Sequence, residues 1–216
     1  MSLKLYFGPG ACSFVPHAML QLSGADYEAE MVKLHKNEQG GEAFTAINPR
    51  AQVPVLAHDG MIIDQVVAIL LYLDDLLPDA GILPGSGEAR TRALQTLMWM
   101  NNTVHPTFTH IFMPQKFTDD AAAQTALRQF NTDLFAKRLG ELDAMCAALP
   151  AGAWLSGDKP GALDAYAMTF LRWGSIAKID PIQFAALWAL ANRFYELPAL
   201  QPVIERERLQ LNLMPA

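Results

Sequence analysis

The sequence predicts a two-part chain, in which a small α/β unit is followed by an all-helical unit. The first part, residues 1–78, changes its hydrophobic period repeatedly over short distances, which is typical of small alternating strands and helices. The second part, residues 89–216, keeps helical spacing, and the segment between them, residues 79–88, is rich in Gly and Pro. At 216 residues the chain is long enough for two modest domains joined by such a linker.

The order of elements in the first unit follows from turn signals and short periodic runs. Gly8-Pro9-Gly10 marks a turn between the first strand and the first helix, and Asp59-Gly60 marks a hairpin. The predicted order is β-α-β-α-β-β-α, with strands at 3–7, 27–34, 53–57 and 61–63 and helices at 13–22, before 47 and after 64.

The helical unit is clearest in one long amphipathic stripe, whose steps of three and four residues predict a helix that ends at Pro150. The stripe consists of Leu127, Phe130, Leu134, Phe135, Leu139, Leu142, Cys146 and Leu149. Further helices are predicted at about 89–110, 162–177, 183–196 and 199–208.

Composition narrows the class of partner. The net charge is −6 without any basic run, which argues against nucleic acid and anionic membrane surfaces. No stretch as long as a membrane span is free of charged or polar residues. The chain opens without the pattern of a secretory signal, and its two cysteines, Cys12 and Cys146, lie in segments of different character. We therefore expect reduced thiols, a cytoplasmic location and a small-molecule partner, with no metal.

Cys12 lies just after the Gly-Pro-Gly turn, where a helix begins. Unpaired backbone N–H groups and the positive end of the helix dipole favour a thiolate at such a position. An internal dithiol would need a second cysteine three residues on, where Val15 stands, so one-thiol chemistry or stabilisation of a bound thiolate remains, with the Ser13 hydroxyl as a donor to sulfur. A buried small hydrophobe is the commoner role of a lone cysteine, and the position leaves both roles open.

Val53-Pro54 enters a predicted strand, where proline removes a ladder donor. A cis bond here would turn the Val53 backbone groups outward to pair with an extended peptide, whereas an ordinary trans proline is the more frequent case. At the start of the next helix, Gln65 and the N–H of Val66 offer donors to a carboxylate, although simple helix capping explains the same junction.

Taken together, these sites resemble the cytosolic glutathione transferases, with the bacterial beta class as the nearest match. The resemblance spans the chain and rests on the following segments: 6–13 with Pro16-His17, 48–56, Ala68-Ile69 with Tyr72-Leu73, Ser156-Gly157-Asp158, Asp164-Ala165-Tyr166 and Leu171-Arg172-Trp173. It implies a thioredoxin-like N-terminal domain (βαβαββα) that holds glutathione and an all-α C-terminal helical bundle that shapes a pocket for an apolar co-substrate.

The resemblance also implies roles for residues of the first domain. Val53, before a cis Pro54, would pair with the cysteinyl backbone of glutathione, and Cys12 would lie beside the glutathione sulfur, where it can form a mixed disulfide. Lys36 would reach the glycyl carboxylate. Gln65 and the N–H of Val66 would hold the γ-glutamyl end.

In the second domain, the resemblance places His105 opposite the sulfur, with Asn102 and Thr103 on the same wall. The apolar residues of this helix are more often packing residues, and those facing the cleft would form the co-substrate wall; they are Met98, Trp99, Met100, Phe108, Phe112 and Met113. A homodimer is expected from the family, with glutathione as co-substrate and a small apolar electrophile as the second partner.

Three positions depart from the family pattern. Val66 stands where a serine hydroxyl usually binds the γ-glutamyl carboxylate, which removes a hydrogen bond of about 1 to 3 kcal/mol if that group is buried. Pro106 replaces a lysine that often follows the histidine. Gly161 replaces the serine or threonine of a helix-capping box, with Asp164 as the remaining partner, at an expected cost of a few tenths of a kcal/mol.

The resulting prediction is a detoxifying glutathione transferase. Cys12 and Ser13 would stabilise the glutathione thiolate, His105 would assist from the opposite wall, and the thiolate would attack an electrophilic carbon or, through Cys12, a disulfide or peroxide. Glutathione-dependent reduction or dehalogenation is a second enzymatic hypothesis. A non-catalytic regulatory or interaction protein that kept the fold is a third.

Overall fold

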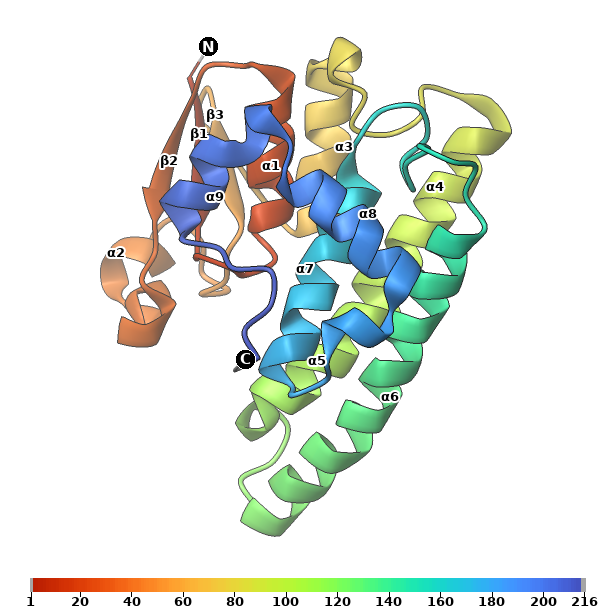
Figure 1. The fold of residues 1–216 in the computed structure, drawn as a ribbon. Helices are drawn as coiled ribbons and strands as arrows, with labels where there is room; N and C mark the ends of the chain where they lie inside the picture. The colour runs from red at the N-terminus through yellow and green to blue at the C-terminus, as the bar shows by residue number, and fades with distance from the viewer. Residues whose placement is uncertain (1, 215–216) are drawn as a thin grey trace.

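The computed structural model describes residues 2–214, and its N-terminal part has the predicted βαβαββα order (Figure 1). The elements are β1 (Leu3–Phe7), α1 (Phe14–Ser23), β2 (Tyr27–Met31), α2 (Glu42–Thr45), β3 (Val55–His58), β4 (Met61–Asp64) and α3 (Val66–Leu76). This order, followed by a helical part, confirms the predicted fold class of a thioredoxin-like domain joined to an all-α domain.

The sheet has the strand order β2-β1-β3-β4, with β1 parallel to β2 and antiparallel to β3, and β3 antiparallel to β4. Alternation along β1 sends Leu3, Leu5 and Phe7 into the main core, and Tyr6 packs against a smaller cluster on the other face that contains Phe44 of α2. The sheet is therefore covered by α1 and α3 on one face and by α2 on the other.

The helical part is built from α4 (Gly87–Trp99), a π-helical turn (Met100–Val104, η4), α5 (His105–Phe112), α6 (Ala121–Ala147), α7 (Ala162–Ile176), α8 (Ala185–Tyr195) and α9 (Gln201–Glu207). Short 3-10 turns lie at Leu34–Lys36 (η1), Glu38–Gly40 (η2), Pro78–Ala80 (η3), Pro114–Lys116 (η5), Pro181–Gln183 (η6) and Pro198–Leu200 (η7). Within residues 2–214 there is no helix both long enough and apolar enough to cross a membrane.

The single helix predicted at 89–110 is interrupted by the π turn. Pro106 has no N–H, so the ordinary bond back to the carbonyl of Asn102 cannot form. The backbone widens just before it, and the N–H of His105 donates to the carbonyl of Met100. The prediction of one regular helix is wrong at this point, because it gave no weight to the missing donor.

The segment between α3 and α4 is packed rather than loose. Ile82 and Leu83 are buried, and the N–H of Leu83 donates to Asp74, which also pairs with Arg90 at 2.6 Å. Helix α4 already begins at Gly87, inside the segment expected as a linker. One continuous apolar cluster includes side chains from both parts of the chain, so they share a core.

The N-terminus of α7 is capped from a distance. Asp164 accepts hydrogen bonds from the N–H groups of Gly161 and Leu155, at 3.0 and 2.8 Å, and burial raises the pKa of its carboxyl. The Ser156 hydroxyl accepts the N–H of Leu163 at 3.0 Å. Ser156 thereby supplies the capping oxygen that Gly161 cannot, so the expected cost of glycine at the cap is offset by a residue earlier in the loop.

Gly161→Ser, which restores the family's capping residue, is expected to destabilise the protein. An added Cβ would lie 2.7 Å from both the Ile82 carbonyl oxygen and Ser156 Cβ. Overpacking of this kind costs about 1 to 3 kcal/mol in the free energy of unfolding, measurable by urea titration. Gly140→Ser is the matched control, because a Cβ there meets nothing within 4 Å. A Gly161→Ser protein as stable as the wild type would contradict the capping role assigned to Ser156.

Candidate active site

Cys12 and Val53 lie far apart in the sequence and meet at the mouth of α1. The Cys12 thiol donates a long hydrogen bond of 3.6 Å to the carbonyl of Val53, and the Val53–Pro54 peptide bond is cis. Cys12 is half-buried and directly precedes Ser13, the N-cap of α1. Two of the predicted sites therefore form one.

Burial controls the chemistry of the Cys12 thiol. Burial raises its pKa to about 12, although the N–H groups of Cys12 and Ser13 act in the opposite direction. In the absence of a ligand, Cys12 is thus a protonated thiol at neutral pH, consistent with its donation to Val53. The helix N-terminus does not by itself make this cysteine a thiolate, which differs from the sequence-based expectation.

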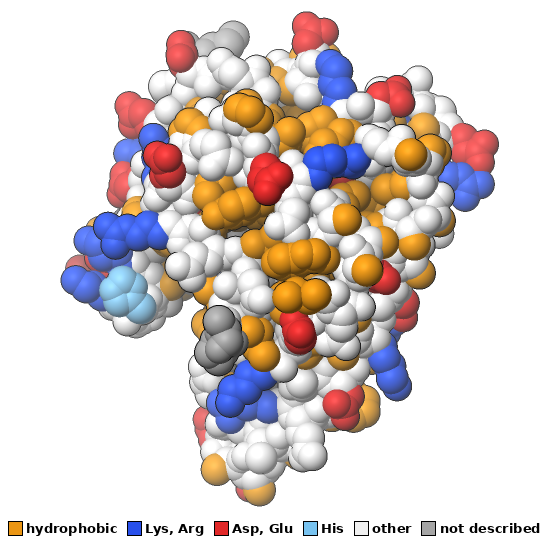
Figure 2. Space-filling model, viewed as in Figure 1, with side chains coloured by type: hydrophobic (Ala, Val, Ile, Leu, Met, Phe, Trp, Pro, Cys, Tyr) orange, Lys and Arg blue, Asp and Glu red, His pale blue; other side chains and the backbone are white. Residues whose placement is uncertain are grey.

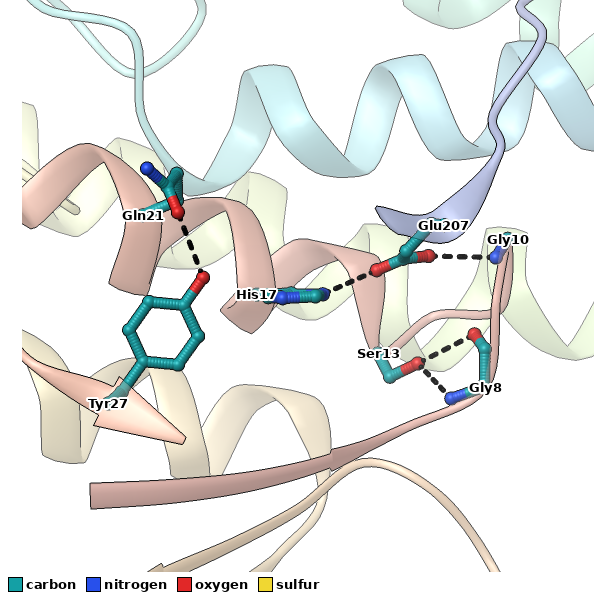
Figure 3. Close-up of polar contacts among 7 residues, drawn as sticks. All are labelled: Gly8, Gly10, Ser13, His17, Gln21, Tyr27 and Glu207. Atoms are coloured by element: carbon teal, nitrogen blue, oxygen red, sulfur yellow. Dashed lines mark hydrogen bonds and ion pairs between the residues drawn. The ribbon is translucent and has the colours of Figure 1, made fainter. Parts of the chain in front are cut away.

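The Ser13 side chain is turned into the loop between β1 and α1. Its side chain is fully buried, its hydroxyl donates to the carbonyl of Gly8 at 3.1 Å, and it accepts the N–H of Gly8 at 3.0 Å (Figure 3). Because the single hydroxyl proton is used inside the turn, this geometry does not provide the expected donation to a bound sulfur. The backbone N–H of Ser13 is the group that faces Cys12.

Val53 and the start of α3, which the sequence predicts to bind glutathione, leave backbone N–H groups unpaired within residues 2–214. Among residues 2–214, nothing bonds to the N–H of Val53, and α3 leaves the N–H groups of its first turn, including that of Val66, without partners. Gln65 is exposed and has a positive φ of 73°. The Val66 side chain is buried in the main core, so nothing on it replaces the missing serine hydroxyl.

Lys36 lies at the rim of the molecule. It ends η1, and its exposed side chain forms no ion pair with any described residue. Figure 2 shows basic side chains and a histidine gathered on the left edge, where η1 and α2 lie; the exposed residues there include Lys33, His35 and Lys36. Below this edge the outline of the molecule is indented toward the helical domain.

His105 begins α5, directly after the π turn that carries Asn102 and Thr103. Its Nδ1 lies 2.8 Å from the hydroxyl of Tyr166 on α7, and its ring lies 5.0 Å from that of Trp173. Burial lowers the pKa of His105 to about 4, so the ring is neutral at pH 7. Asn102 is exposed and Thr103 half-buried, and neither side chain bonds to His105.

A column of aromatic rings runs along this wall. Phe108 stacks on Trp173 with ring centroids 4.5 Å apart, and Phe112 stacks on Phe108 at 5.7 Å. Trp173 and Phe108 are buried, whereas 56% of Phe112 is exposed. The indole N–H of Trp173 donates to the carbonyl of Gly10 at 2.9 Å, so the column begins at the Cys12 turn and ends in an exposed apolar face.

Gly10 is held from both sides by the helical domain. Its N–H donates to Glu207 of α9 at 2.8 Å (Figure 3). Its carbonyl accepts from Trp173 and, at 3.2 Å, from Arg172. His17 of α1 donates to the other oxygen of Glu207 at 2.6 Å. Gly10 has a φ of 67°, and a Cβ there would lie 2.5 Å from the Arg172 guanidinium, so only glycine fits.

Sequence reasoning assigned no role to Glu207, His17, Arg172 or Tyr166. A signal was available for Glu207, because it follows Val203 and Ile204 at helical spacing on the buried face of α9. A carboxylate on an apolar face requires a partner. Separately, the structure contains no group of His, Cys, Asp and Glu side chains in residues 2–214 that could hold a metal ion.

Glu207→Gln is expected to destabilise the protein, since one amide cannot accept from both Gly10 and His17. Loss of one buried, charge-assisted hydrogen bond costs about 1 to 3 kcal/mol in the free energy of unfolding. Glu205→Gln on the exposed face of α9 is the matched control and should stay within about 0.5 kcal/mol of the wild type. Equal stability of the two variants in urea titration would show that the Glu207 bonds contribute nothing.

Alkylation of Cys12 should be slow at neutral pH. In a Cys146→Ser background, the rate with iodoacetamide is expected to rise roughly tenfold per pH unit to above pH 10, because only the thiolate reacts and burial keeps the thiol protonated below its pKa of about 12. The same protein unfolded in urea should react with an ordinary thiol pKa of about 8.5. A rate that is already at its plateau at pH 7 would contradict this prediction.

Comparison with known proteins agrees with the geometry. Residues 1–75 match the family model of the glutathione S-transferase N-terminal domain. The chain is 31% identical over 211 residues to glutathione S-transferase GstA of Escherichia coli O157:H7, in an alignment that covers 96% of this chain and 100% of that protein.

Solved structures give the same result. A sphingomonad glutathione S-transferase complexed with glutathione has a TM-score of 0.80 at 31% identity. The bacterial beta-class glutathione S-transferase of Sphingomonas chungbukensis has a TM-score of 0.80 at 30% identity. Each of these two alignments covers 96% of this chain and 100% of the compared chain. Since the sequence similarity and the two-part fold both extend along nearly the whole length, the chain belongs to the glutathione S-transferase family.

Proposed function

We propose that the protein is a glutathione transferase that conjugates the glutathione thiolate to small apolar electrophiles. The observation that carries the proposal is the contact of Cys12 with Val53, whose N–H has no partner among residues 2–214, at the N-terminus of α1. An extended peptide that pairs with Val53 would place its own sulfur beside Cys12, where the N–H groups of Cys12 and Ser13 stabilise a thiolate. The sphingomonad relative, whose structure contains glutathione, supports this choice of ligand.

The remaining contacts suit the two charged ends of glutathione. Lys36, which pairs with no described acid, is a cation at the rim for the glycyl carboxylate. Gln65 and the N–H of Val66, which is without a partner among residues 2–214, would hold the γ-glutamyl end. The exposed face of Phe112, at the end of the aromatic column, supplies an apolar surface for the electrophile, with His105, Asn102 and Thr103 on the same side. Val66 lacks the hydroxyl, so we expect weaker glutathione binding than in relatives that have it.

The protonation state of Cys12 favours conjugation over redox chemistry. A thiol with a pKa of about 12 is a poor nucleophile toward disulfides or peroxides at neutral pH, but it can donate a hydrogen bond to a glutathione thiolate. We assign Ser13 to holding the turn and His105 to the facing wall. A cytoplasmic, homodimeric detoxification enzyme is the setting that this proposal implies.

Cys12→Ala tests the assignment of the sulfur. Calorimetry should show that glutathione and S-hexylglutathione bind to the wild type, and the variant should keep most of its conjugation of 1-chloro-2,4-dinitrobenzene. Loss of conjugation with retained glutathione binding would instead assign Cys12 to the chemical step. Thiol–disulfide exchange by the wild type that Cys12→Ala abolishes would favour the reductase hypothesis. Absence of binding by either ligand to the wild type would favour the non-catalytic alternative.

A further inference from the structure

A chain of polar side chains leads from His105 to the π turn. The hydroxyl of Tyr166 lies 2.8 Å from Nδ1 of His105 and 3.3 Å from Oδ1 of Asn101. Asn101 in turn donates its amide nitrogen to Oδ1 of Asn102 at 2.9 Å. Asn101 and Asn102 belong to the π turn, and Tyr166 is fully buried on α7, with its ring stacked on Phe170 at 4.4 Å.

The number of protons on each group determines which side chain donates and which accepts in these hydrogen bonds. The amide nitrogen of Asn101 is used by Asn102, so Asn101 presents to Tyr166 an oxygen that can only accept. A phenol has one proton, and donation to Asn101 leaves the Tyr166 oxygen as an acceptor for His105. The contact of 2.8 Å then requires the proton to be on Nδ1 of the imidazole.

The surroundings of His105 keep the ring neutral, so that only one nitrogen carries a proton. Burial lowers its pKa to about 4, and the rings of Phe170 and Trp173 lie 6.4 and 5.0 Å away. Burial raises the pKa of the Tyr166 phenol well above its usual value, and a charge on the nearby Cys12 sulfur acts in the same direction. The polar chain and Cys12 therefore belong to one site, although they come from different domains.

We propose that Tyr166 and Asn101 are positioning residues that hold His105 as the neutral Nδ1–H tautomer, which leaves Nε2, a nitrogen without a partner among residues 2–214, as a hydrogen-bond acceptor. The catalytic consequence rests on the proposed function: Nε2 accepts the S–H of incoming glutathione and orients its sulfur. Because the pKa of the ring is so low, the proton of the S–H passes to solvent water when the sulfur ionises, and the N–H groups of Cys12 and Ser13 stabilise the thiolate.

Nitrogen NMR of protein labelled with 15N-histidine tests the tautomer without any ligand. The protein has five histidines, and the His105 signals are those that disappear in His105→Gln. At pH 7 the wild type should show a protonated Nδ1 and an unprotonated Nε2. A wild-type His105 protonated at Nε2 overturns the proposal.

Two substitutions at Asn101 test whether Tyr166 donates to Asn101 and accepts from His105, and not only whether these side chains are in contact. Asn101→Leu removes the acceptor and frees Tyr166 to donate to Nδ1, so the proton should move to Nε2. Asn101→Asp keeps an acceptor oxygen and should keep the wild-type tautomer. If Asn101→Leu leaves the proton on Nδ1, the proposal fails, and this result does not depend on whether a Tyr166 variant folds.

Tyr166→Phe tests the catalytic role, since it keeps the ring that stacks on Phe170. We expect kcat for conjugation to fall several-fold with the KM for glutathione unchanged. Tyr195→Phe is the matched control, because the Tyr195 hydroxyl donates to the carbonyl of Leu209, away from His105. An unchanged kcat in Tyr166→Phe overturns the positioning role. Absence of any turnover in the wild type overturns the proposed function instead and leaves the tautomer assignment intact.

Discussion

The site depends on the hydrogen bonds by which the helical domain holds both backbone groups of one residue, Gly10. The N–H of Gly10 is bound by Glu207 of α9, and its carbonyl is bound by Arg172 and Trp173 of α7. These bonds fix the turn between β1 and α1, and this turn determines where Cys12 and the first N–H groups of α1 lie. The reacting end of the thioredoxin-like domain is therefore positioned by residues near the other end of the sequence.

Two opposing effects determine which charges are stable around Cys12 and His105. The N–H groups of Cys12 and Ser13, just before α1, and those in the first turn of α3 have no backbone partner among residues 2–214, and Lys36, which pairs with no described acid, adds a cation at the rim; together these groups favour an anionic ligand. Burial acts against charge on the protein's own groups, so Cys12 stays a thiol and His105 stays neutral. The site is thus arranged to accept negative charge from a ligand while Cys12 and His105 stay uncharged.

Sequence patterns predicted what local spacing determines. The βαβαββα order, the turn before Cys12 and the long helix α6 all follow from periodicity and turn residues. Periodicity and turn residues did not predict three other features: the π turn, the inward hydroxyl of Ser13, and the bonds of Glu207 to Gly10 and His17. Each of these depends on a missing donor or on a partner that only folding brings close. The resemblance to a family supplied the cis Val53–Pro54 bond, which the residues alone left open.

The three departures from the family pattern have different physical consequences, and this bears on whether the protein remains an enzyme. Gly161 is compensated, because Ser156 caps α7 in its place. Pro106 removes a lysine but also accompanies the π turn that carries Asn101 to Tyr166 behind His105. Only Val66 is uncompensated, since its side chain is buried in the core. The loss is then one hydrogen bond at the γ-glutamyl end, which weakens ligand binding without removing the groups around the sulfur, so it favours an enzyme with modest affinity over a fold that has lost its chemistry.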